Sequence, residues 1–109
     1  MIPLAGSQKA QNEVANSTKN STGKTVTKIT VKYNCGFPNN LFIRGEGIQG
    51  LNWEKGVALK NVKADEWTWE TDKPFNKAKF KILLNDMHYE NGENHIPDCG
   101  KQITCTPKF

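Results

Sequence analysis

Two aromatic side chains, one lysine and one amide stand out in this chain because of the stretches in which they occur. Trp53 lies in a polar stretch flanked by glycines, Lys81 in an alternating segment, and Tyr89 and Asn94 close together near residue 90. Flat aromatic rings pack against the C–H faces of sugar rings, and lysine and amide groups hydrogen-bond to the hydroxyls at the ring edges. The combination is typical of a surface that holds a sugar chain. We therefore expect a binding module and not an enzyme.

The carboxylates and histidines of the chain do not favour catalysis. A glycosidase needs two carboxyl groups across a substrate cleft, and a domain this small rarely has such a cleft. His88 and His95 have no partner at the spacing of metal ligands, so we expect ordinary surface histidines. No serine-nucleophile or phosphate-binding motif is present. We predict no catalytic residue, no metal and no cofactor. The glutamates that such a carboxyl pair would have to come from are Glu66, Glu70, Glu90 and Glu93.

Length and charge indicate one domain without a polyanionic partner. The chain has 109 residues, of which 36% are hydrophobic, enough for a single modest core. Its net charge is +4, but the first 24 residues hold three lysines and one glutamate, which leaves 12 basic and 10 acidic groups for the remainder. The lysines and carboxylates are interspersed and form no basic stripe. Binding of single-stranded nucleic acid has suitable residue types, but it lacks the clustered positive groove. We expect no nucleic-acid partner.

The first residues of the chain do not resemble a signal peptide, since they have neither a basic segment nor an apolar run of about 7–15 residues. No apolar stretch approaches the roughly 18 residues of a membrane span, so we expect no membrane partner. We expect a cytoplasmic protein if the chain is full length. If it is a trimmed piece, the sequence leaves the compartment open.

Three cysteines, Cys35, Cys99 and Cys105, cannot all pair within one chain. At least one thiol is therefore free in a monomer. Two alternatives remain at this point, namely three reduced thiols or a single disulfide.

The order of polar and apolar residues predicts a β domain over residues 24–109 that follows a polar tail or linker over residues 1–23. Period-two alternation and turn residues predict about seven short strands and no helix. Asn85 and Asp86 are expected to form a hairpin turn. This pattern is typical of an antiparallel β-sandwich. The predicted strands cover residues 25–33, 41–45, 57–62, 66–71, 77–84, 87–90 and 101–106.

The alternation also assigns faces to the predicted strands. Ile29 and Val31 should point into the core, and Trp67 and Trp69 should share the inward face of their strand. Lys81 should point outward, because its neighbours on either side are apolar.

Several short motifs, taken in order, resemble those of the starch-binding and glycogen-binding carbohydrate modules. The resemblance covers roughly residues 26–107. It implies an immunoglobulin-like antiparallel β-sandwich that binds an α-glucan polysaccharide or maltooligosaccharide without catalysis, with a separate carbohydrate-active enzyme as a further partner. The motifs are Leu51-x-Trp53-x-x-Gly56-x-x-Leu59, Trp67, Phe80-Lys81 and Tyr89-Glu90-x-x-x-Asn94.

The resemblance implies a carbohydrate-binding site made of Trp53, Lys81, Tyr89, Glu90 and Asn94. In that family two aromatic residues form an exposed platform, and a lysine and an asparagine assist.

The chain departs from the family pattern at three positions. Asn52 replaces the usual glycine, Tyr89 the usual second tryptophan, and His95 a residue that is often basic.

Ordinary structural roles remain open for each of these residues. Trp53 could cover one end of the sandwich, Tyr89 could pair across strands, Lys81 could be merely solvated and Asn94 could stabilise a turn. The alternative function is a protein-interaction or structural sandwich of the same fold that does not bind sugar.

Overall fold

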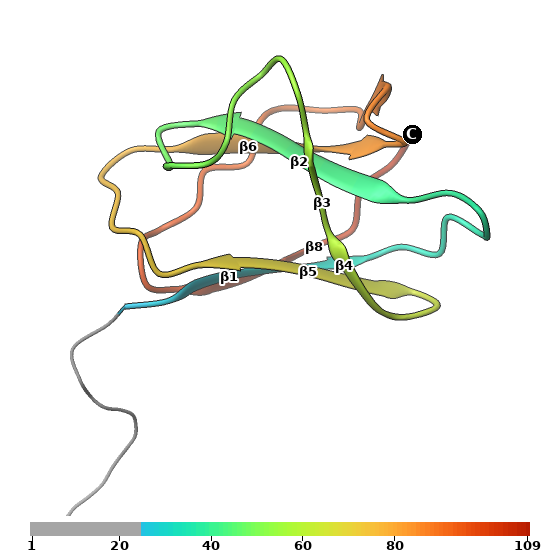
Figure 1. Ribbon diagram of the computed structural model, residues 1–109, viewed down its shortest axis with the longest axis horizontal. Coiled ribbons are helices and arrows are strands. Elements are labelled where there is room, and N and C mark those ends of the chain that lie inside the picture. The colour runs from blue at the N-terminus through green and yellow to red at the C-terminus, as the bar shows by residue number, and fades with distance from the viewer. Residues whose placement is uncertain (1–24) are drawn as a thin grey trace, which may run out of the picture.

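A computed structural model describes residues 25–109 as a sandwich of two four-stranded sheets (Figure 1). The predicted polar tail over residues 1–23 lies outside the described residues. One sheet has the strand order β4-β5-β1-β8 and the other β3-β2-β6-β7. All regular structure in the described part is strand, which confirms the predicted all-β sandwich. The strands are β1 (Thr27–Lys32), β2 (Leu41–Glu46), β3 (Val57–Ala58), β4 (Lys60–Lys63), β5 (Glu66–Thr71), β6 (Lys79–Leu84), β7 (His88–Tyr89) and β8 (Gln102–Cys105).

The core lies between the two sheets and is built from the faces that the alternation predicts. Ile29 and Val31 of β1 are fully buried. In the opposite sheet, the buried Ile43 of β2 is paired with the buried Ile82 of the neighbouring strand β6. Trp67 is buried as well, and its indole Nε1 donates a hydrogen bond of 3.1 Å to the carbonyl of Tyr33. Trp69 is only half-buried and packs against the core from the same strand. Burial of a large apolar side chain stabilises a fold by roughly 1.5–3 kcal/mol, so this double layer is the main source of stability.

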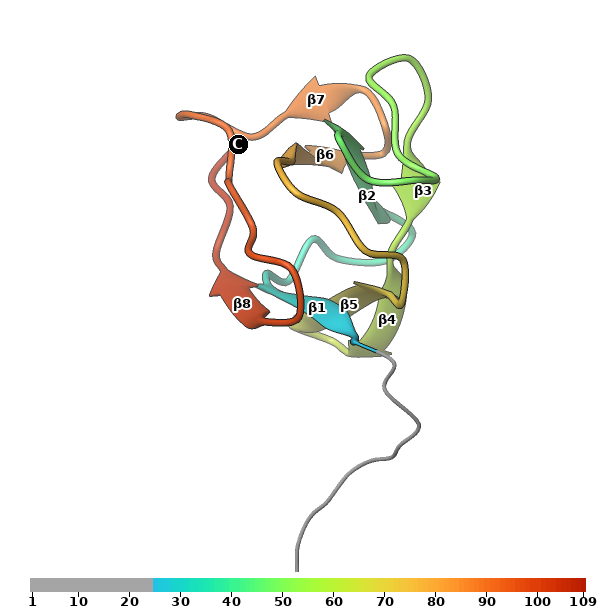
Figure 2. The same ribbon diagram turned by 90° about the vertical axis from the view of Figure 1, so that its left-hand side faces the viewer.

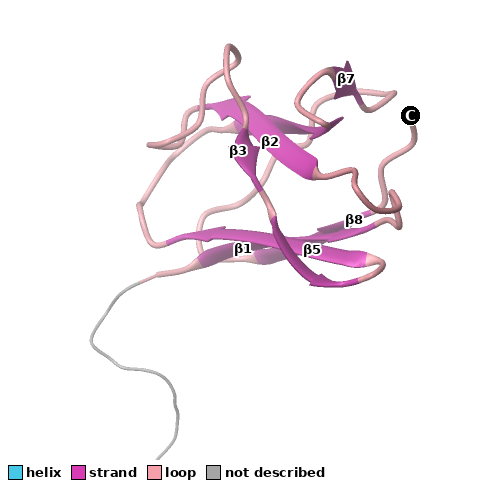
Figure 3. Cartoon of the chain, turned by 45° about the vertical axis from the view of Figure 1, so that its right-hand side comes forward, coloured by secondary structure: helices cyan, strands magenta, loops and turns pink. Residues whose placement is uncertain are grey.

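The predicted strand over residues 57–62 is wrong, because the chain divides there between the two sheets. β3 pairs with β2, whereas β4 pairs with β5 of the other sheet (Figure 3). Between them Leu59 turns into the core, and its backbone N–H donates to the carbonyl of Leu41 at 3.0 Å. Burial of this one leucine therefore takes precedence over a continuous strand.

One strand pair is parallel, unlike the antiparallel pairing that the sequence predicts. β8 runs parallel to β1, with Ile103 opposite Ile29 and Cys105 opposite Val31. Parallel neighbours need a long connection, and almost the whole domain lies between these two strands in sequence. The segments that follow β7 run along one side of the sandwich and lead the chain to β8 (Figure 2). All other strand pairs in the described residues are antiparallel.

The hairpin turn predicted at Asn85 and Asp86 is confirmed. Both residues have φ of 55°, and the N–H of Met87 donates to the carbonyl of Leu84 at 3.0 Å. Positive φ at both central positions defines the type I′ turn, whose twist suits a tight β-hairpin. Asn and Asp are among the few residues that tolerate this conformation. The turn joins β6 to β7 and places Asp86 at a sharp corner of the second sheet.

The three cysteines are free thiols in this structure, as in one of the two alternatives that the sequence leaves open. Cys105 is buried beside β1, and the loss of solvent, with a smaller effect of the nearby Glu90, raises the pKa of its thiol to about 12. Burial also raises the pKa of Cys35. A protonated thiol is a poor nucleophile, so Cys105 behaves as a small apolar core residue. The described residues contain no helix with the length and hydropathy of a membrane span.

Candidate functional site

The outer face of the sheet β3-β2-β6-β7 carries most of the predicted site residues. Because Ile43 and Ile82 pair inward, the next cross-strand pair, Arg44 with Lys81, must point to the outside. On the other side of the Ile43–Ile82 pair, Phe42 and Leu83 also point to the outside. Leu83 is in turn opposite Tyr89 on β7. Leu83 is fully buried although it belongs to the outer face, so other groups cover this part of the sheet.

Trp53 reaches this face from the loop between β2 and β3. Its side chain is half-buried, and the indole Nε1 donates to Glu46 Oε1 at 2.8 Å. The loop is held by Asn52, whose Oδ1 accepts the backbone N–H groups of Glu54 and Lys55, both at 2.8 Å. Asparagine side chains commonly stabilise turns in this way. The residue that departs from the family pattern therefore orders the Trp53 loop.

Arg44 connects the two aromatic residues, and the sequence analysis did not identify it. One terminal nitrogen of its guanidinium donates to the carbonyl of Trp53 at 2.9 Å and to the hydroxyl of Tyr89 at 3.2 Å. The guanidinium carbon also lies 5.7 Å from the centre of the Tyr89 ring, a cation–π distance. Tyr89 remains 43% exposed. Trp53 and Tyr89 are thus held on the same face by a single side chain.

Asp86 fixes Arg44 from the hairpin turn. The Nε of Arg44 donates to Asp86 Oδ1 at 2.9 Å, and a terminal nitrogen donates to the backbone carbonyl of Asp86 at 3.1 Å. The second carboxylate oxygen accepts the N–H of Gly56 at 3.0 Å. The Arg44 hydrogen bond, assisted by that of Gly56, lowers the pKa of Asp86, and the same carboxylate raises the pKa of Arg44. A Cβ at position 56 would overlap with the Asp86 carboxylate, so the close approach of loop and turn requires glycine there.

Lys81 and Asn94 lie farther along the same side of the molecule. The Lys81 ammonium donates to the carbonyl of Glu90 at 2.9 Å and to the carbonyl of Gly92, so it anchors the loop that follows β7. Asn94 is exposed on that loop and lines a shallow hollow together with Lys81. The structure therefore brings Lys81 close to Asn94, as it brings Trp53 close to Tyr89 through Arg44.

Glu90, which the resemblance includes in the site, is oriented away from the surface. Its side chain is only 4% exposed, and Oε1 accepts the backbone N–H of Ile82 at 2.9 Å. The same oxygen lies 2.7 Å from Nε2 of His95, whose ring stacks on Phe80 with 4.8 Å between the ring centres. His95 is thus a packed and partly buried residue, not the ordinary surface histidine that was predicted. Glu90 supports the 90–95 loop from below and presents no carboxylate oxygen to a ligand on the surface.

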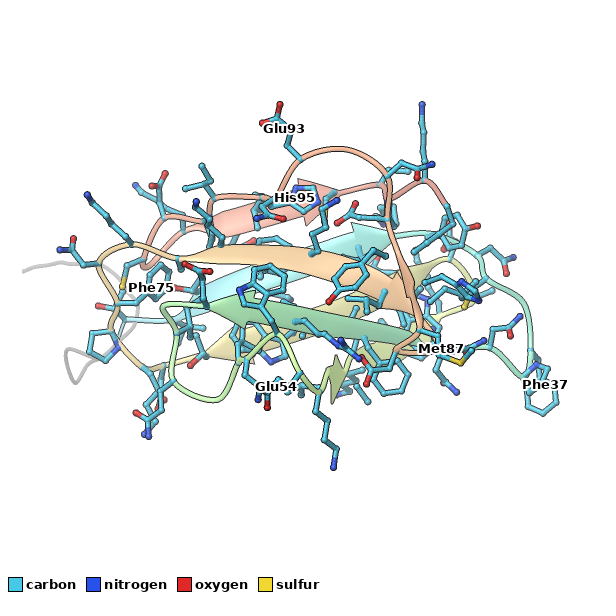
Figure 4. The ribbon with its side chains drawn as sticks, turned by 90° about the horizontal axis from the view of Figure 1, so that it is seen from above. Phe37, Glu54, Phe75, Met87, Glu93 and His95 are labelled. Atoms are coloured by element: carbon cyan, nitrogen blue, oxygen red, sulfur yellow. The ribbon has the colours of Figure 1, made fainter. Side chains whose placement is uncertain are left out.

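Figure 4 shows the outer face from above. Glu54 marks one margin, Glu93 and His95 mark the other, and Met87 lies toward one end. The strands β2 and β6 run side by side between these margins. Within residues 25–109 no group of three or more histidines, cysteines or carboxylates is arranged to hold a metal ion. The outer face thus carries Trp53 and Tyr89 together with charged and amide side chains.

Comparisons with known proteins support the fold. No model of a known protein family matches the sequence, and no curated protein matches it. Among solved structures, the chain is similar to a part of the glycoside hydrolase family 15 glucoamylase from Hypocrea jecorina, with a TM-score of 0.61 and 11% identity over 92% of this chain. This chain spans only 20% of that enzyme. A second match is the solution structure of the CBM25-2 module of the beta/alpha-amylase from Paenibacillus polymyxa, with a TM-score of 0.43 and 19% identity over 75% of this chain and 84% of that one. At these identities the likeness to the glucoamylase concerns the fold alone.

Proposed function

We propose that this domain is a non-catalytic carbohydrate-binding module that holds an α-glucan on the outer face of the sheet β3-β2-β6-β7. One observation carries the proposal: a single guanidinium nitrogen of Arg44 donates to the backbone carbonyl of Trp53 and to the hydroxyl of Tyr89, while Glu46 holds the Trp53 indole, so both aromatic residues are fixed on one face. Rings that are already ordered lose little entropy when a ligand binds. The faces of the rings would contact the C–H groups of the sugar rings.

Polar groups beside the rings suit the hydroxyls of a sugar chain. Tyr89 accepts a hydrogen bond from Arg44, which leaves the phenolic O–H available as a donor. The amide of Asn94 offers both a donor and acceptors, and Lys81 has a third ammonium hydrogen beyond the two that reach Glu90 and Gly92. Glu90 is not part of the proposed contact surface, because it is buried. The choice of an α-glucan, and of a separate carbohydrate-active enzyme as partner, follows the motif resemblance around Trp53 and Tyr89.

Retention on insoluble starch tests the proposal. Trp53→Ala and Tyr89→Ala should each weaken binding by about tenfold, or about 1.4 kcal/mol, because each variant loses a stacking contribution of roughly 1 kcal/mol together with part of the burial of the ring. Titration calorimetry with maltoheptaose measures the same loss in solution. Circular dichroism and thermal unfolding check that the variants remain folded. Equal retention of the wild-type protein and both variants would exclude this face as the site.

Phe37→Ala is the matched control, because Phe37 is an aromatic residue that is 100% exposed on the β1–β2 loop. Its removal costs no packing and leaves the proposed site intact.

The same variant addresses the alternative of a protein-interaction sandwich. Phe37 and Met87, which is 70% exposed, lie toward the same end of the domain in Figure 4. If wild-type protein binds no glucan but self-associates in sedimentation, and Phe37→Ala abolishes that association, the interaction function replaces the proposal.

A further inference from the structure

The outer face continues beyond the two aromatic rings along β2 and β6. Glu46 of β2 is paired with Lys79 of β6, and this is the next outward-facing cross-strand pair after Arg44 and Lys81. Glu46 also accepts the indole N–H of Trp53 at 2.8 Å, so the Trp53 loop lies next to this pair. From Leu83, next to Tyr89, to Lys79 is four residues of strand, or about 13 Å. That distance exceeds the length of a single hexose ring.

Two adjoining hollows open beside Lys79. The first is lined by Lys81 and Asn94, the second by Glu46, Asn76 and Asp98, and both are lined by Lys79 and Ile96. Because they share these two residues, the hollows lie side by side, and together they are called the depression below. It extends the outer face past β6 toward the end of the domain where Phe75 lies in Figure 4, opposite the end of Met87.

Ile96 is the unusual residue of this depression. It is 69% exposed, although isoleucine is among the residues most often buried. It stands among amide and charged groups and offers an aliphatic surface to which the C–H face of a sugar ring can pack. The amides of Asn94 and Asn76 border that surface and can bond to ring hydroxyls. This is the same chemistry as at the rings of Trp53 and Tyr89, with an alkyl group in place of an aromatic one.

The charges around the depression exclude a polyanionic ligand. Its lining contains three lysines and three carboxylates, so there is no excess of either sign. A phosphate-bearing chain would require a surplus of positive charge. Mixed donors and acceptors of balanced charge fit a neutral polyhydroxyl chain. The lining charges are Lys77, Lys79, Lys81, Glu46, Glu93 and Asp98.

We infer that the depression around Ile96 and Lys79 is a second contact region for the same glucan, so that the ligand is a stretch of chain several rings long. Lys81 and Asn94 lie between the two regions, and a single sugar or a short oligosaccharide would occupy the Trp53–Tyr89 region without reaching Ile96 and Lys79. This inference rests on the proposed function, because it extends the same binding face.

The test compares maltotriose with maltoheptaose in titration calorimetry. For the wild-type protein, maltoheptaose should bind about tenfold more tightly than maltotriose, because only the longer chain reaches both regions. The double variant Ile96→Ala, Lys79→Ala should reduce this ratio to about twofold and leave maltotriose affinity unchanged. Both side chains are exposed, so the fold should tolerate their removal. Val62→Ala on β4 of the opposite sheet, also an exposed aliphatic position, is the control and should keep the wild-type ratio.

The two proposals fail in different ways. If wild-type protein binds neither ligand, the proposed function and this extension both fall. If both ligands bind and the double variant retains the wild-type ratio, only the second contact region is overturned. A double variant that loses maltotriose binding as well would also overturn it, because the Ile96 region would then not be separate from the ring site.

Discussion

Arg44 and Asp86 form a two-point contact between β2 and the β6–β7 turn. The Nε of Arg44 donates to the Asp86 carboxylate at 2.9 Å, and a terminal nitrogen donates to the Asp86 backbone carbonyl at 3.1 Å. Both side chains are largely shielded from solvent, with exposures of 17% and 23%. The guanidinium is thereby fixed in the position from which it contacts Trp53 and Tyr89. Order in the proposed binding face therefore depends on a pair that contacts no ligand in the proposal.

We predict that Asp86→Asn lowers the free energy of unfolding at pH 7 by about 1–2 kcal/mol, because charge-assisted hydrogen bonds to Arg44 and Gly56 are weakened. Asparagine tolerates the positive φ of this position, so the turn itself should persist. The folded-state pKa of Asp86 is below its ordinary value. Its contribution is therefore present above the unfolded-state pKa of about 3.9 and is lost as the pH falls through the lower folded-state value.

The measurement is urea unfolding of wild-type and Asp86→Asn protein between pH 7 and pH 2. The stability difference between the two should stay constant down to about pH 4 and then shrink. Glu70→Gln, at an exposed position of β5 in the other sheet, makes the same chemical change without this contact and should leave stability unchanged. A difference that does not vary with pH would contradict the assigned role of the carboxylate.

Tyr89→Phe separates the ring from its hydroxyl. The phenylalanine ring should keep its place beside Arg44 and its stacking surface, but it loses the hydrogen bond of 3.2 Å and the O–H donor. We expect maltoheptaose affinity to fall by about threefold, less than the roughly tenfold loss for Tyr89→Ala. Titration calorimetry gives both values. Equal losses for the two variants would mean that the hydroxyl, not the stacked ring, supplies the contribution of Tyr89.

Much of the fold could be predicted from residue order because each long strand has one buried face. β5 begins and ends at the predicted residues, Glu66 and Thr71, since Trp67 and Trp69 mark its inward side. The division of residues 57–62 could not be predicted, because Val57 and Val62 have the composition of strand residues yet are exposed, and only the burial of Leu59 decides the path. The parallel direction of β8 has no local signal either, since alternation is the same in both directions.

The arrangement at the candidate site has a signal in the sequence only in part, for a similar reason. Trp53, Tyr89 and Asn94 carry recognisable chemistry in their side chains, so residue type and motif order point to them. Arg44 acts through a contact with a residue 42 positions away, and no local pattern encodes that contact. Its one signal was a charged side chain directly after the apolar run Leu41–Ile43, outward by alternation. The depth of Glu90 below the surface likewise depends on packing that the sequence does not display.

Gly45 allows β2 and β6 to approach each other at the inward side of the binding sheet. A Cβ at this position would overlap with the carbonyl oxygen of Lys79 and press on Phe80. We predict that Gly45→Ala lowers the free energy of unfolding by about 2–3 kcal/mol, because backbone atoms must move apart. Gly50→Ala is the comparison, since no atom lies near a Cβ there and only its φ of +100° opposes alanine. It should cost about 1 kcal/mol. Chemical denaturation of both variants measures the difference, and a larger loss at Gly50 would contradict the packing argument.

Glu90 provides the sharpest distinction between a supporting residue and a ligand-binding residue. Its Oε1 accepts the N–H of fully buried Ile82 and lies 2.7 Å from Nε2 of His95. Glu90→Ala leaves that N–H without an acceptor, so we expect a loss of about 3 kcal/mol in the free energy of unfolding. Glu90→Gln keeps an acceptor oxygen and should lose about 1 kcal/mol.

Maltotriose binding by the folded Glu90→Gln variant then decides the role of the carboxylate. A residue that is 4% exposed and acts from below the loop should leave the affinity unchanged within about twofold, although the protein unfolds at lower urea concentration. If the Glu90 carboxylate instead contacted the sugar directly, Glu90→Gln would lose a charge-assisted hydrogen bond to a sugar hydroxyl. Affinity would then fall about tenfold with little change in stability. A tenfold loss of affinity would place Glu90 on the contact surface. It would also require the 90–95 loop to turn outward when glucan binds.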